Sequence, residues 1–418
     1  MTIVIAASGT RGDVQPYVAL GKGLKDAGYA VRVVSSDDFR SLIEEAGLEF
    51  GSMGSSVEQM LDSPEWREVV EGGNFLKILG RMTAEMKRRA QHLARLMPAL
   101  YDGAEMIVAG LGGLGGAFSI AEKLGVPAIQ AYVLPLNPTG AYASPIAPAD
   151  SLGGTLNRLS FDVMRQALWQ STRSADVTLR RELGMRRASF WGPYRRLRKT
   201  RTPALYGYSR HVLPTAERSA DLEATTGFWM LDPPATWTPP VELVEFLRTG
   251  PSPVYIGFGS MGSRNPEEAA QLILKALALS GQRGILATGW GGLHAADLPD
   301  SVCVIRAVPH RWLFPQMAAV VHHGGVGTTA AGLQAGLPSI VIPFMADQPF
   351  WGRRVAAMGV GPVPIPRKRL TAENLARAIT QAVTDQPMRR RAADLGEKIR
   401  AEDGVGHAVA LIRRWSTR

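Results

Sequence analysis

Short apolar runs alternate with amphipathic stretches along the first half of the chain. Four runs rich in valine, isoleucine and alanine predict buried strands at residues 2–6, 30–34, 106–109 and 128–131. The stretches between them carry apolar residues at helical spacing, at residues 14–27, 36–46 and 75–100. An alternation of strand and helix is typical of βαβ units, which build a parallel sheet with helices on both faces.

The same alternation begins again in the second half. Further apolar runs predict strands at residues 254–258, 284–287, 302–305, 318–321 and 339–342. After the first of these strands, Asn265 can cap a helix and Pro266 suits its first turn, while Glu267 and Glu268 complement the helix dipole. A last helical stretch is expected at residues 388–415.

Residues 231–240 separate the two series with four prolines in ten residues. Because proline interrupts both helices and strands, this segment is interpreted as a linker. A chain of 418 residues also exceeds the roughly 250–300 residues that one core supports. We therefore expect an N-terminal α/β domain at 1–231, a linker at 232–252 and a C-terminal α/β domain at 253–395. A C-terminal helix at 396–418 is expected to pack back toward the first domain.

The composition is that of an ordinary soluble globular protein, with 45% hydrophobic and 20% charged residues. No run approaches the roughly 18–20 apolar residues of a membrane span. The chain enters a strand at once, without the basic and apolar segments of a signal peptide. The single cysteine, Cys303, excludes an intramolecular disulfide and fits a reducing compartment, so a cytoplasmic protein is expected.

The net charge of +10 is concentrated between Arg173 and Arg201. A solvated helix face and loop is the first interpretation of this stretch. The second is peripheral contact with anionic lipid, worth about 1 kcal/mol per basic residue, because Phe190, Trp191 and Tyr194 suit an interface where aromatic rings are half hydrated. Nucleic acid is not expected as a partner, because no binding motif accompanies the charge.

The strongest chemical signal is the glycine-rich turn at residues 322–329, which follows the predicted strand 318–321 and reads His-His-Gly-Gly-Val-Gly-Thr-Thr. Backbone N–H groups at such a helix start bind anions. His323 lies at the carboxyl end of the strand, where ligands bind in open parallel sheets. Its imidazole can hydrogen-bond a phosphate beside the hydroxyls of Thr328 and Thr329. Turn geometry alone would explain the glycines but not these polar residues, so phosphate binding is predicted.

Two neighbouring loops carry further candidates. Asp347 and Gln348 follow the next predicted strand and offer the acceptors and donors that bind sugar hydroxyls, although Asp347 could equally cap a helix that begins at Gln348. The loop at residues 307–314 could hold a planar base, while its Trp312 and Phe314 fit a core equally well.

The loop at residues 9–16 follows the first predicted strand and does not match the pattern GxGxxG. Asp13 in this loop has two interpretations. It can be the N-cap of the following helix. It can also be a general base, because burial raises the pKa of a carboxyl group toward a useful value.

Together these motifs resemble the GT-B glycosyltransferases that use nucleotide sugars, a superfamily that includes UDP-glycosyltransferases and bacterial antibiotic glycosyltransferases. Within it, the chain is most similar to sterol 3β-glucosyltransferases. The resemblance rests on residues 9–17, 254–261, 287–292, 308–315 and 322–351, and is looser over 51–214. It implies a GT-B fold, in which two Rossmann-like α/β domains face each other across a cleft.

The resemblance also implies roles for individual residues. Asp13 stands where many members carry histidine, and the resemblance to antibiotic and sterol enzymes makes it the catalytic base. His323 and Ser260 would contact the donor phosphates, Trp290 and Val308 would border the base, and Asp347 and Gln348 would bind the sugar. The full implied donor site is Arg11, Gly12, Ser260, Trp290, Val308, His310, His323, Gly325, Gly327, Thr328, Thr329, Asp347 and Gln348.

The activity implied by the resemblance is inverting transfer of glucose from UDP-glucose to a sterol or similar lipophilic alcohol. No metal or other cofactor is expected, since the chain has no Asp-x-Asp motif. One alternative is an antibiotic-type enzyme of secondary metabolism that uses a UDP- or dTDP-sugar on a polyketide, macrolide or peptide aglycone. A module that binds nucleotide sugar or lipid without transfer is disfavoured, because Asp13, His323, Asp347 and Gln348 are all present.

Overall fold

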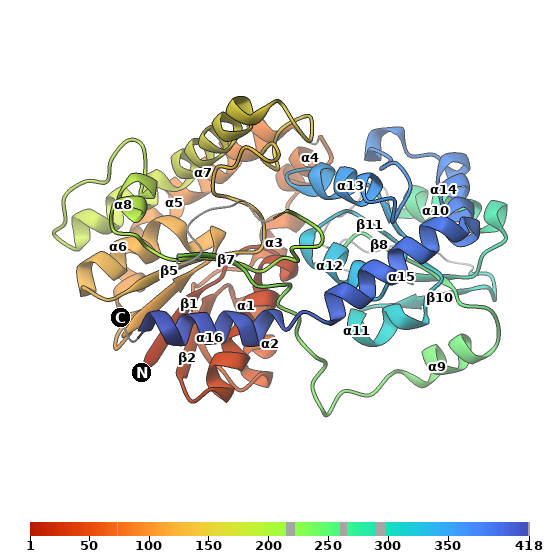
Figure 1. The fold of residues 1–418 in the computed structure, drawn as a ribbon, viewed down its shortest axis with the longest axis horizontal. Helices are drawn as coiled ribbons and strands as arrows, with labels where there is room; N and C mark the ends of the chain where they lie inside the picture. Colours follow the sequence, from red (N-terminus) through yellow and green to blue (C-terminus); the bar gives the residue numbers. More distant parts are fainter. Residues whose placement is uncertain (73, 215–221, 260–265, 289–297, 417–418) are drawn as a thin grey trace. The chain divides into compact units, whose positions relative to one another are not determined.

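The computed structural model describes residues 1–72, 74–214, 222–259, 266–288 and 298–416. The chain folds into two compact units (Figure 1). Unit 1 contains Met1–Val57, Phe75–Leu231 and Glu402–Arg418, and unit 2 contains Glu58–Asn74 and Asp232–Ala401. Residues 58–74 thus fold with unit 2, although they lie inside the range 1–231 expected for the first domain.

Unit 1 is built on a seven-stranded sheet in the order β3-β2-β1-β4-β5-β6-β7, in which every neighbouring pair is parallel. The strands are β1 (Thr2–Ala6), β2 (Ala30–Ser35), β3 (Glu49–Ser52), β4 (Met106–Ala109), β5 (Ala128–Tyr132), β6 (Ala204–Tyr206) and β7 (Glu223–Thr225). Ile3, Val4 and Ile5 of β1 are all fully buried, as expected for a strand covered on both faces.

Seven α-helices accompany this sheet among the described residues: α1 (Arg11–Asp26), α2 (Arg40–Glu45), α5 (Phe75–Leu100), α6 (Leu114–Leu124), α7 (Gly154–Glu182), α8 (Tyr194–Lys199) and α16 (Gly404–Ser416). Short 3₁₀ turns lie at Asp37–Phe39 and Leu111–Gly113. α5 packs along α7, and α16 packs against α1 (Figure 1). The second contact is close, because a Cβ built on Gly23 of α1 would lie 2.4 Å from Val405 Cγ1 of α16.

Unit 2 is built on a five-stranded parallel sheet in the order β10-β9-β8-β11-β12. Its strands are β8 (Val254–Gly257), β9 (Gly284–Ala287), β10 (Val302–Ile305), β11 (Ala319–His322) and β12 (Ser339–Val341). Its described helices are α9 (Val241–Arg248), α10 (Pro266–Ser280), α11 (His310–Leu313), α12 (Val326–Gln334), α13 (Gln348–Ala357), α14 (Ala372–Thr384) and α15 (Gln386–Arg400). 3₁₀ turns lie at Phe314–Gln316 and Arg367–Arg369, and α3 (Val57–Asp62) and α4 (Pro64–Gly72) come from the earlier part of the chain.

The two parallel sheets confirm the predicted α/β fold class, and each predicted strand is present to within one residue at either end. The single helical stretch predicted at residues 388–415 is wrong, because α15 ends at Arg400 and α16 starts at Gly404. Asp403 lies at the break, directly before α16. Its carboxylate accepts a hydrogen bond from the backbone N–H of Gly406 at 2.9 Å, which caps a new helix.

Candidate functional site

In unit 2, the loops after β8 and β11 meet at the carboxyl edge of the sheet. β8 lies between β9 and β11, so the winding of the chain reverses between β8 and β11. Open parallel sheets bind ligands at this position. A Cβ built on Gly259, after β8, would lie 3.2 Å from Cε1 of His323, after β11. The two loops are therefore in contact beside the first turn of α12.

The N-terminus of α12 is suited to an anion. Gly325 is its N-cap, no side chain caps it, and its first turn holds no acidic residue. The first N–H groups of a helix have no partner within the helix, and the dipole gives them a positive partial charge. Here these groups belong to Val326, Gly327 and Thr328.

The two threonines of this turn have different environments. Thr329 is buried, and its hydroxyl donates a hydrogen bond to the backbone oxygen of Gly325 at 2.9 Å. Because a hydroxyl has one proton, Thr329 has no further donor for a phosphate oxygen. Thr328 is partly exposed in the third position of the helix. Thr328 is therefore the hydroxyl that the turn offers to a ligand.

His323 is held between two glycines. A Cβ on Gly325 would lie 2.3 Å from Nε2 of His323, so a larger residue at position 325 would displace the ring. The Nδ1 atom of His323 is buried and has no hydrogen-bond partner among the described residues. Burial lowers the pKa of His323 to about 4, so the imidazole is neutral near pH 7 and carries one N–H donor.

His322 has a structural role in the same turn. It is fully buried, and its Nδ1 accepts a hydrogen bond from the backbone N–H of Gly324 at 3.1 Å. Gly324 has a φ of +89°, and a Cβ there would lie 2.7 Å from Val341 Cγ1. The turn thus requires glycine at position 324. The buried His322 side chain holds the backbone of this turn in place through its hydrogen bond with Gly324.

The loop after β12 positions Asp347 and Gln348. The side-chain oxygen of Gln348 accepts hydrogen bonds from the backbone N–H groups of Phe344 at 2.8 Å and Met345 at 3.0 Å. Asp347 is the residue before α13, but its carboxylate accepts from the indole of Trp351 at 2.8 Å instead of capping the helix. Ala346 has a φ of +55°, which is strained for a residue with a Cβ. A strained loop held by these contacts is typical of a ligand site.

The loop after β10 contains Val308 and His310. Val308 is buried, and His310 stacks on Phe314 with ring centroids 4.3 Å apart. The Tyr255 hydroxyl lies 3.3 Å from Nε2 of His310. Phe314 is fully buried, which confirms the core interpretation for this residue. Of the other predicted donor residues, Ser260 and Trp290 lie outside the described residues.

In unit 1, Asp13 lies in the first turn of α1, directly after β1. β1 lies between β2 and β4, so this loop occupies the equivalent reversal point of the first sheet. The N-cap of α1 is Thr10, not Asp13, because the helix begins at Arg11. The Asp13 carboxylate accepts hydrogen bonds from the Thr10 backbone N–H at 2.9 Å and from the Thr10 hydroxyl at 3.0 Å. Asp13 is thus the acidic half of a capping box.

The packing around Asp13 is tight. Gly9 has a φ of +136°, and a Cβ there would lie 2.5 Å from the Asp13 carboxylate. Tyr17, one turn later, is buried and donates a hydrogen bond to the backbone oxygen of Ala131 at 2.8 Å. Burial raises the pKa of Asp13, and the hydrogen bonds from Thr10 partly oppose that shift. Of its predicted neighbours, Gly12 is partly exposed, and Arg11 is exposed and donates to Gln15 at 3.1 Å.

Comparison with known proteins identifies the family. Two family models match: "Glycosyltransferase family 28 N-terminal domain" over residues 3–143, and "Erythromycin biosynthesis protein CIII-like, C-terminal domain" over residues 290–407. Two sterol 3-beta-glucosyltransferases of Arabidopsis thaliana are 35% and 33% identical to the chain, cover 98% and 99% of it, and are themselves covered over 64% and 68% of their lengths. The chain belongs to the GT-B glycosyltransferase superfamily.

Other relatives of this glycosyltransferase are longer proteins, and its structural neighbours share its fold. A sterol 3-beta-glucosyltransferase of Emericella nidulans is 32% identical over 99% of the chain, which spans 30% of that relative. The calicheamicin glycosyltransferase CalG4 has a TM-score of 0.71 and 18% identity, over 100% of this chain and 98% of that one. VinC, solved in complex with dTDP, has a TM-score of 0.65 and 17% identity, over 100% of both chains.

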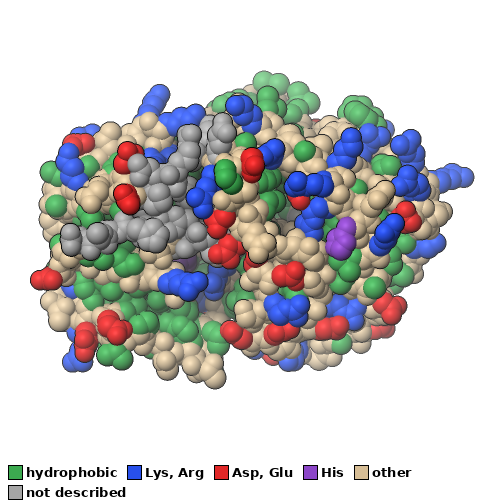
Figure 2. Space-filling model, turned by 180° about the vertical axis from the view of Figure 1, so that it is seen from behind, with side chains coloured by type: hydrophobic (Ala, Val, Ile, Leu, Met, Phe, Trp, Pro, Cys, Tyr) green, Lys and Arg blue, Asp and Glu red, His purple; other side chains and the backbone are tan. Residues whose placement is uncertain are grey.

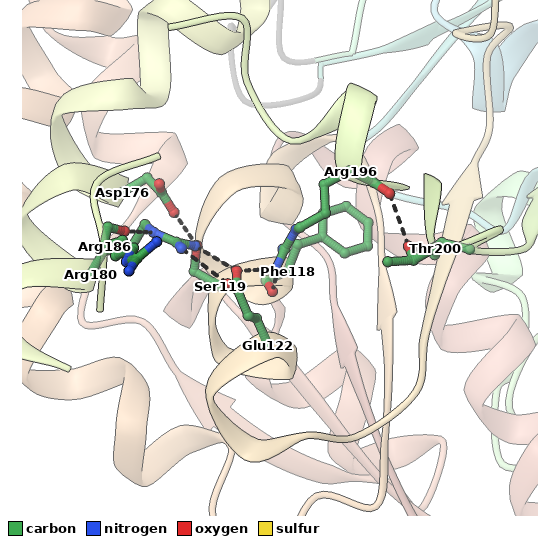
Figure 3. Close-up of polar contacts among 9 residues, drawn as sticks. Phe118, Ser119, Glu122, Asp176, Arg180, Arg186, Arg196 and Thr200 are labelled. Atoms are coloured by element: carbon green, nitrogen blue, oxygen red, sulfur yellow. Dashed lines mark hydrogen bonds and ion pairs between the residues drawn. The ribbon is translucent and has the colours of Figure 1, made fainter. Parts of the chain in front are cut away.

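Part of the basic stretch of this glycosyltransferase is used internally (Figure 3). The Arg180 guanidinium donates to both oxygens of Glu122, at 2.8 and 3.2 Å, and to the Ser119 hydroxyl at 3.0 Å. Arg196 forms an ion pair with the same carboxylate and donates to the Phe118 backbone oxygen at 3.2 Å. Burial disfavours the ionised Glu122, but the two arginines outweigh it and lower the pKa of Glu122. Arg180 and Arg196 therefore stabilise unit 1.

Several residues of this glycosyltransferase's site were not predicted from the sequence. Thr10, which binds the Asp13 carboxylate, could have been found from its spacing three residues before an acidic residue. Gly259 beside His323, and Trp351 beside Asp347, carry no local signal that separates them from ordinary turn and core residues.

Proposed function

We propose that this glycosyltransferase transfers glucose from UDP-glucose to the hydroxyl of a sterol or similar lipophilic alcohol, with inversion at the anomeric carbon. The observation that carries the proposal is 31–35% identity to proteins named sterol 3-beta-glucosyltransferases over at least 98% of this chain. The chain spans about two thirds of the plant relatives and less than a third of the fungal ones. Because the chain matches only part of each relative, the complete transfer reaction is part of our proposal.

The donor half of the proposal uses unit 2. The neutral His323 imidazole and the backbone N–H groups of Val326, Gly327 and Thr328 form the set of donors that a diphosphate requires. Such donors are preorganised and stabilise the charge that develops on the departing nucleoside diphosphate. The side-chain NH2 group of Gln348 and the Asp347 carboxylate would bind sugar hydroxyls, while the Gln348 oxygen holds the loop in place.

The acceptor half of the proposal uses Asp13 as the general base. Asp13 accepts the proton of the acceptor hydroxyl while the hydroxyl oxygen forms a bond to the anomeric carbon. The bond from that carbon to the phosphate oxygen breaks, and its electron pair leaves with UDP. A raised pKa makes the carboxylate a better base, and its second oxygen has no hydrogen-bond partner among the described residues.

A second candidate is an antibiotic-type enzyme that uses a dTDP- or UDP-sugar on a polyketide, macrolide or peptide aglycone. The specific observation for it is the match of residues 290–407, which hold most of the donor loops, to the C-terminal domain of an erythromycin biosynthesis protein family. This candidate changes the donor base and the acceptor but leaves the roles of Asp13 and His323 as proposed.

A crossed screen of donors and acceptors separates the two candidates. UDP-glucose, other UDP-sugars and dTDP-glucose are each incubated with the protein and cholesterol, ergosterol or a macrolide aglycone, and products are identified by mass spectrometry. Steryl glucoside formed from UDP-glucose is the expected product. Glycosylation of the aglycone with no steryl product in any combination overturns the sterol proposal.

A further inference from the structure

An apolar stripe lies exposed on the first half of α7. Leu156, Leu159 and Val163 are each more than half exposed, and Leu152, just before the helix, is exposed as well. Because helical side chains repeat every 3.6 residues, positions 156, 159 and 163 share one face. The opposite side of the helix is used for the core, since Phe161 and Met164 are buried. Isolated exposed leucines are ordinary, but a row of them along one helix face is not.

The same face of α7 continues into a loop that displays two aromatic rings. At intervals of three and four residues, positions 166, 170 and 173 extend the stripe. Gln166 and Gln170 donate hydrogen bonds to the backbone oxygen of Phe190, at 3.2 and 2.9 Å. The Arg173 guanidinium lies 5.6 Å from the centre of the Phe190 ring. The apolar stripe and the Phe190 loop are therefore neighbours on one helix face.

The loop holds its aromatic rings in place while leaving them exposed. Phe190 and Trp191 are both more than half exposed, and their rings contact edge to face at 5.3 Å. The indole of Trp169 donates to the Phe190 backbone oxygen at 3.0 Å. Gly192 has a φ of +78°, and a Cβ there would lie 2.8 Å from the Trp169 ring. The backbone is thus fixed against α7, and the exposure of the two rings is built into the fold.

The segment that carries these rings has exposed charges of one dominant sign. With Arg180 and Arg196 paired inside unit 1 (Figure 3), the exposed basic residues between positions 181 and 201 are Arg181, Arg186, Arg187, Arg195, Arg198, Lys199 and Arg201. Glu182 is the exposed acidic residue in this segment. Figure 2, which views the molecule from behind, shows further Lys and Arg side chains gathered over unit 1.

We propose that this surface, the α7 face (Leu156, Leu159, Val163, Phe190 and Trp191), docks on an anionic lipid bilayer. Apolar and aromatic side chains enter the headgroup region, while exposed basic residues of the segment 181–201 that carries the two rings bind lipid phosphates. Every described helix is too short or too polar to be a candidate membrane span. The inference goes beyond the proposed transfer reaction and does not depend on it.

Charge complementarity favours lipid over a second copy of the chain. A twofold dimer formed through the α7 face would bring the same basic segment of each copy to the same interface. Each copy carries seven exposed basic residues and one exposed acidic residue in this segment, so the two positively charged segments would repel each other. An anionic bilayer neutralises the same charges and accepts the aromatic rings.

Sedimentation with vesicles tests the proposal on the whole protein without any substrate. Vesicles of phosphatidylcholine alone are compared with vesicles that also contain phosphatidylserine, at low and high salt. The protein is expected to pellet with the anionic vesicles, and to be released by salt. Arg195→Gln/Arg198→Gln removes two exposed charges and is expected to weaken binding roughly thirtyfold, at about 1 kcal/mol per charge. Leu156→Ser/Leu159→Ser/Val163→Ser is expected to weaken it at least about tenfold.

Matched controls come from exposed residues of unit 2. Arg377→Gln/Arg390→Gln removes two exposed charges, and Val241→Ser/Leu279→Ser/Val363→Ser removes three exposed apolar side chains. Both are expected to bind vesicles like the wild type. Equal losses in test and control variants overturn the proposal. A second outcome also overturns the proposal. In it, the wild-type protein does not bind anionic vesicles and sediments as a dimer, and Leu156→Ser/Leu159→Ser/Val163→Ser dissociates that dimer. The α7 face is then an interface between copies.

Discussion

The helices α1 and α12 occupy equivalent places in the two units but have opposite electrostatic character at their first turns. Each helix follows a strand at the reversal point of its parallel sheet, and each has glycine as its second residue, Gly12 or Gly327. In α1 the third residue is Asp13, whose carboxylate caps Thr10. In α12 the third residue is Thr328, and the N-cap is Gly325, with no side-chain cap.

This difference between the first turns of α1 and α12 suits the two helix starts to different functions. A helix start that already holds its own carboxylate is a poor site for a second anion, because the two negative charges repel. The α1 terminus therefore suits a base, and the open α12 terminus suits a diphosphate. The shifts in pKa agree, since burial raises the pKa of Asp13 while it lowers that of His323 to about 4.

The largest effect is expected from removing the base on the α1 side. Asp13→Asn keeps an oxygen that can accept from Thr10, so the helix start is preserved. Transfer to the acceptor is expected to fall by about a thousandfold, within the range known for general base catalysis. The dissociation constant for UDP, measured by calorimetry, should stay within about twofold. Turnover within tenfold of the wild type would exclude Asp13 as the base.

The next largest effect is expected from giving α12 the first turn of α1. Thr328→Asp places a carboxylate in the third position of the helix, where Asp13 lies in α1. Affinity for UDP is expected to drop roughly a hundredfold through repulsion of the diphosphate. Thermal stability should rise slightly, because an acid in the first turn complements the dipole by about 0.3–1 kcal/mol. Thr328→Asn is the isosteric control and should bind UDP almost normally. If both variants bind equally well, no phosphate lies at this terminus.

A smaller effect is expected on stability below neutral pH. Because the pKa of folded His323 is about 4 and that of an unfolded histidine is about 6.5, only the unfolded state takes up the proton between these values. The stability contributed by neutral His323 is thus present above pH 6.5 and lost as the pH falls toward 4. Allowing for its partial exposure, the wild type should lose roughly 2 kcal/mol more than His323→Gln over this window. Denaturant unfolding at several pH values measures the difference, and parallel profiles would contradict it.

Hydrophobic pattern was enough to predict nine of the twelve described strands, but the sequence does not contain the pairings made between distant segments. Arg180 and Arg196 were predicted to belong to a solvated or lipid-binding stretch. Both instead pair with Glu122, which lies 58 residues before Arg180 in the sequence. The first part of α7 (Gly154–Glu182), before Arg173, was not predicted, because its exposed leucines and buried aromatic residues obscure the usual two-sided pattern. The strands β6 and β7, with three residues each, are too short to show any period.

The site was predicted in its types of residue more than in its local geometry. The sequence identified the turn at residues 322–329, but not that the Thr329 hydroxyl bonds to Gly325 while Thr328 remains available. One interpretation made Asp13 the N-cap of α1, because the helical pattern starts at Val14, whereas the helix begins at Arg11. Hydrogen bonds of this kind depend on which residue is the first of the helix. An apolar pattern does not locate a helix boundary to within one residue.

The smallest effect, no change, is expected on removal of metal ions. The open α12 terminus and His323 supply donors that would take the place of a cation at the departing diphosphate. Transfer rates in EDTA should therefore stay within about twofold of those in EDTA presaturated with magnesium. A loss restored by magnesium would mean that a cation shares the charge of the leaving group. The contrast between the two helix starts would then locate the diphosphate without explaining how its charge is stabilised.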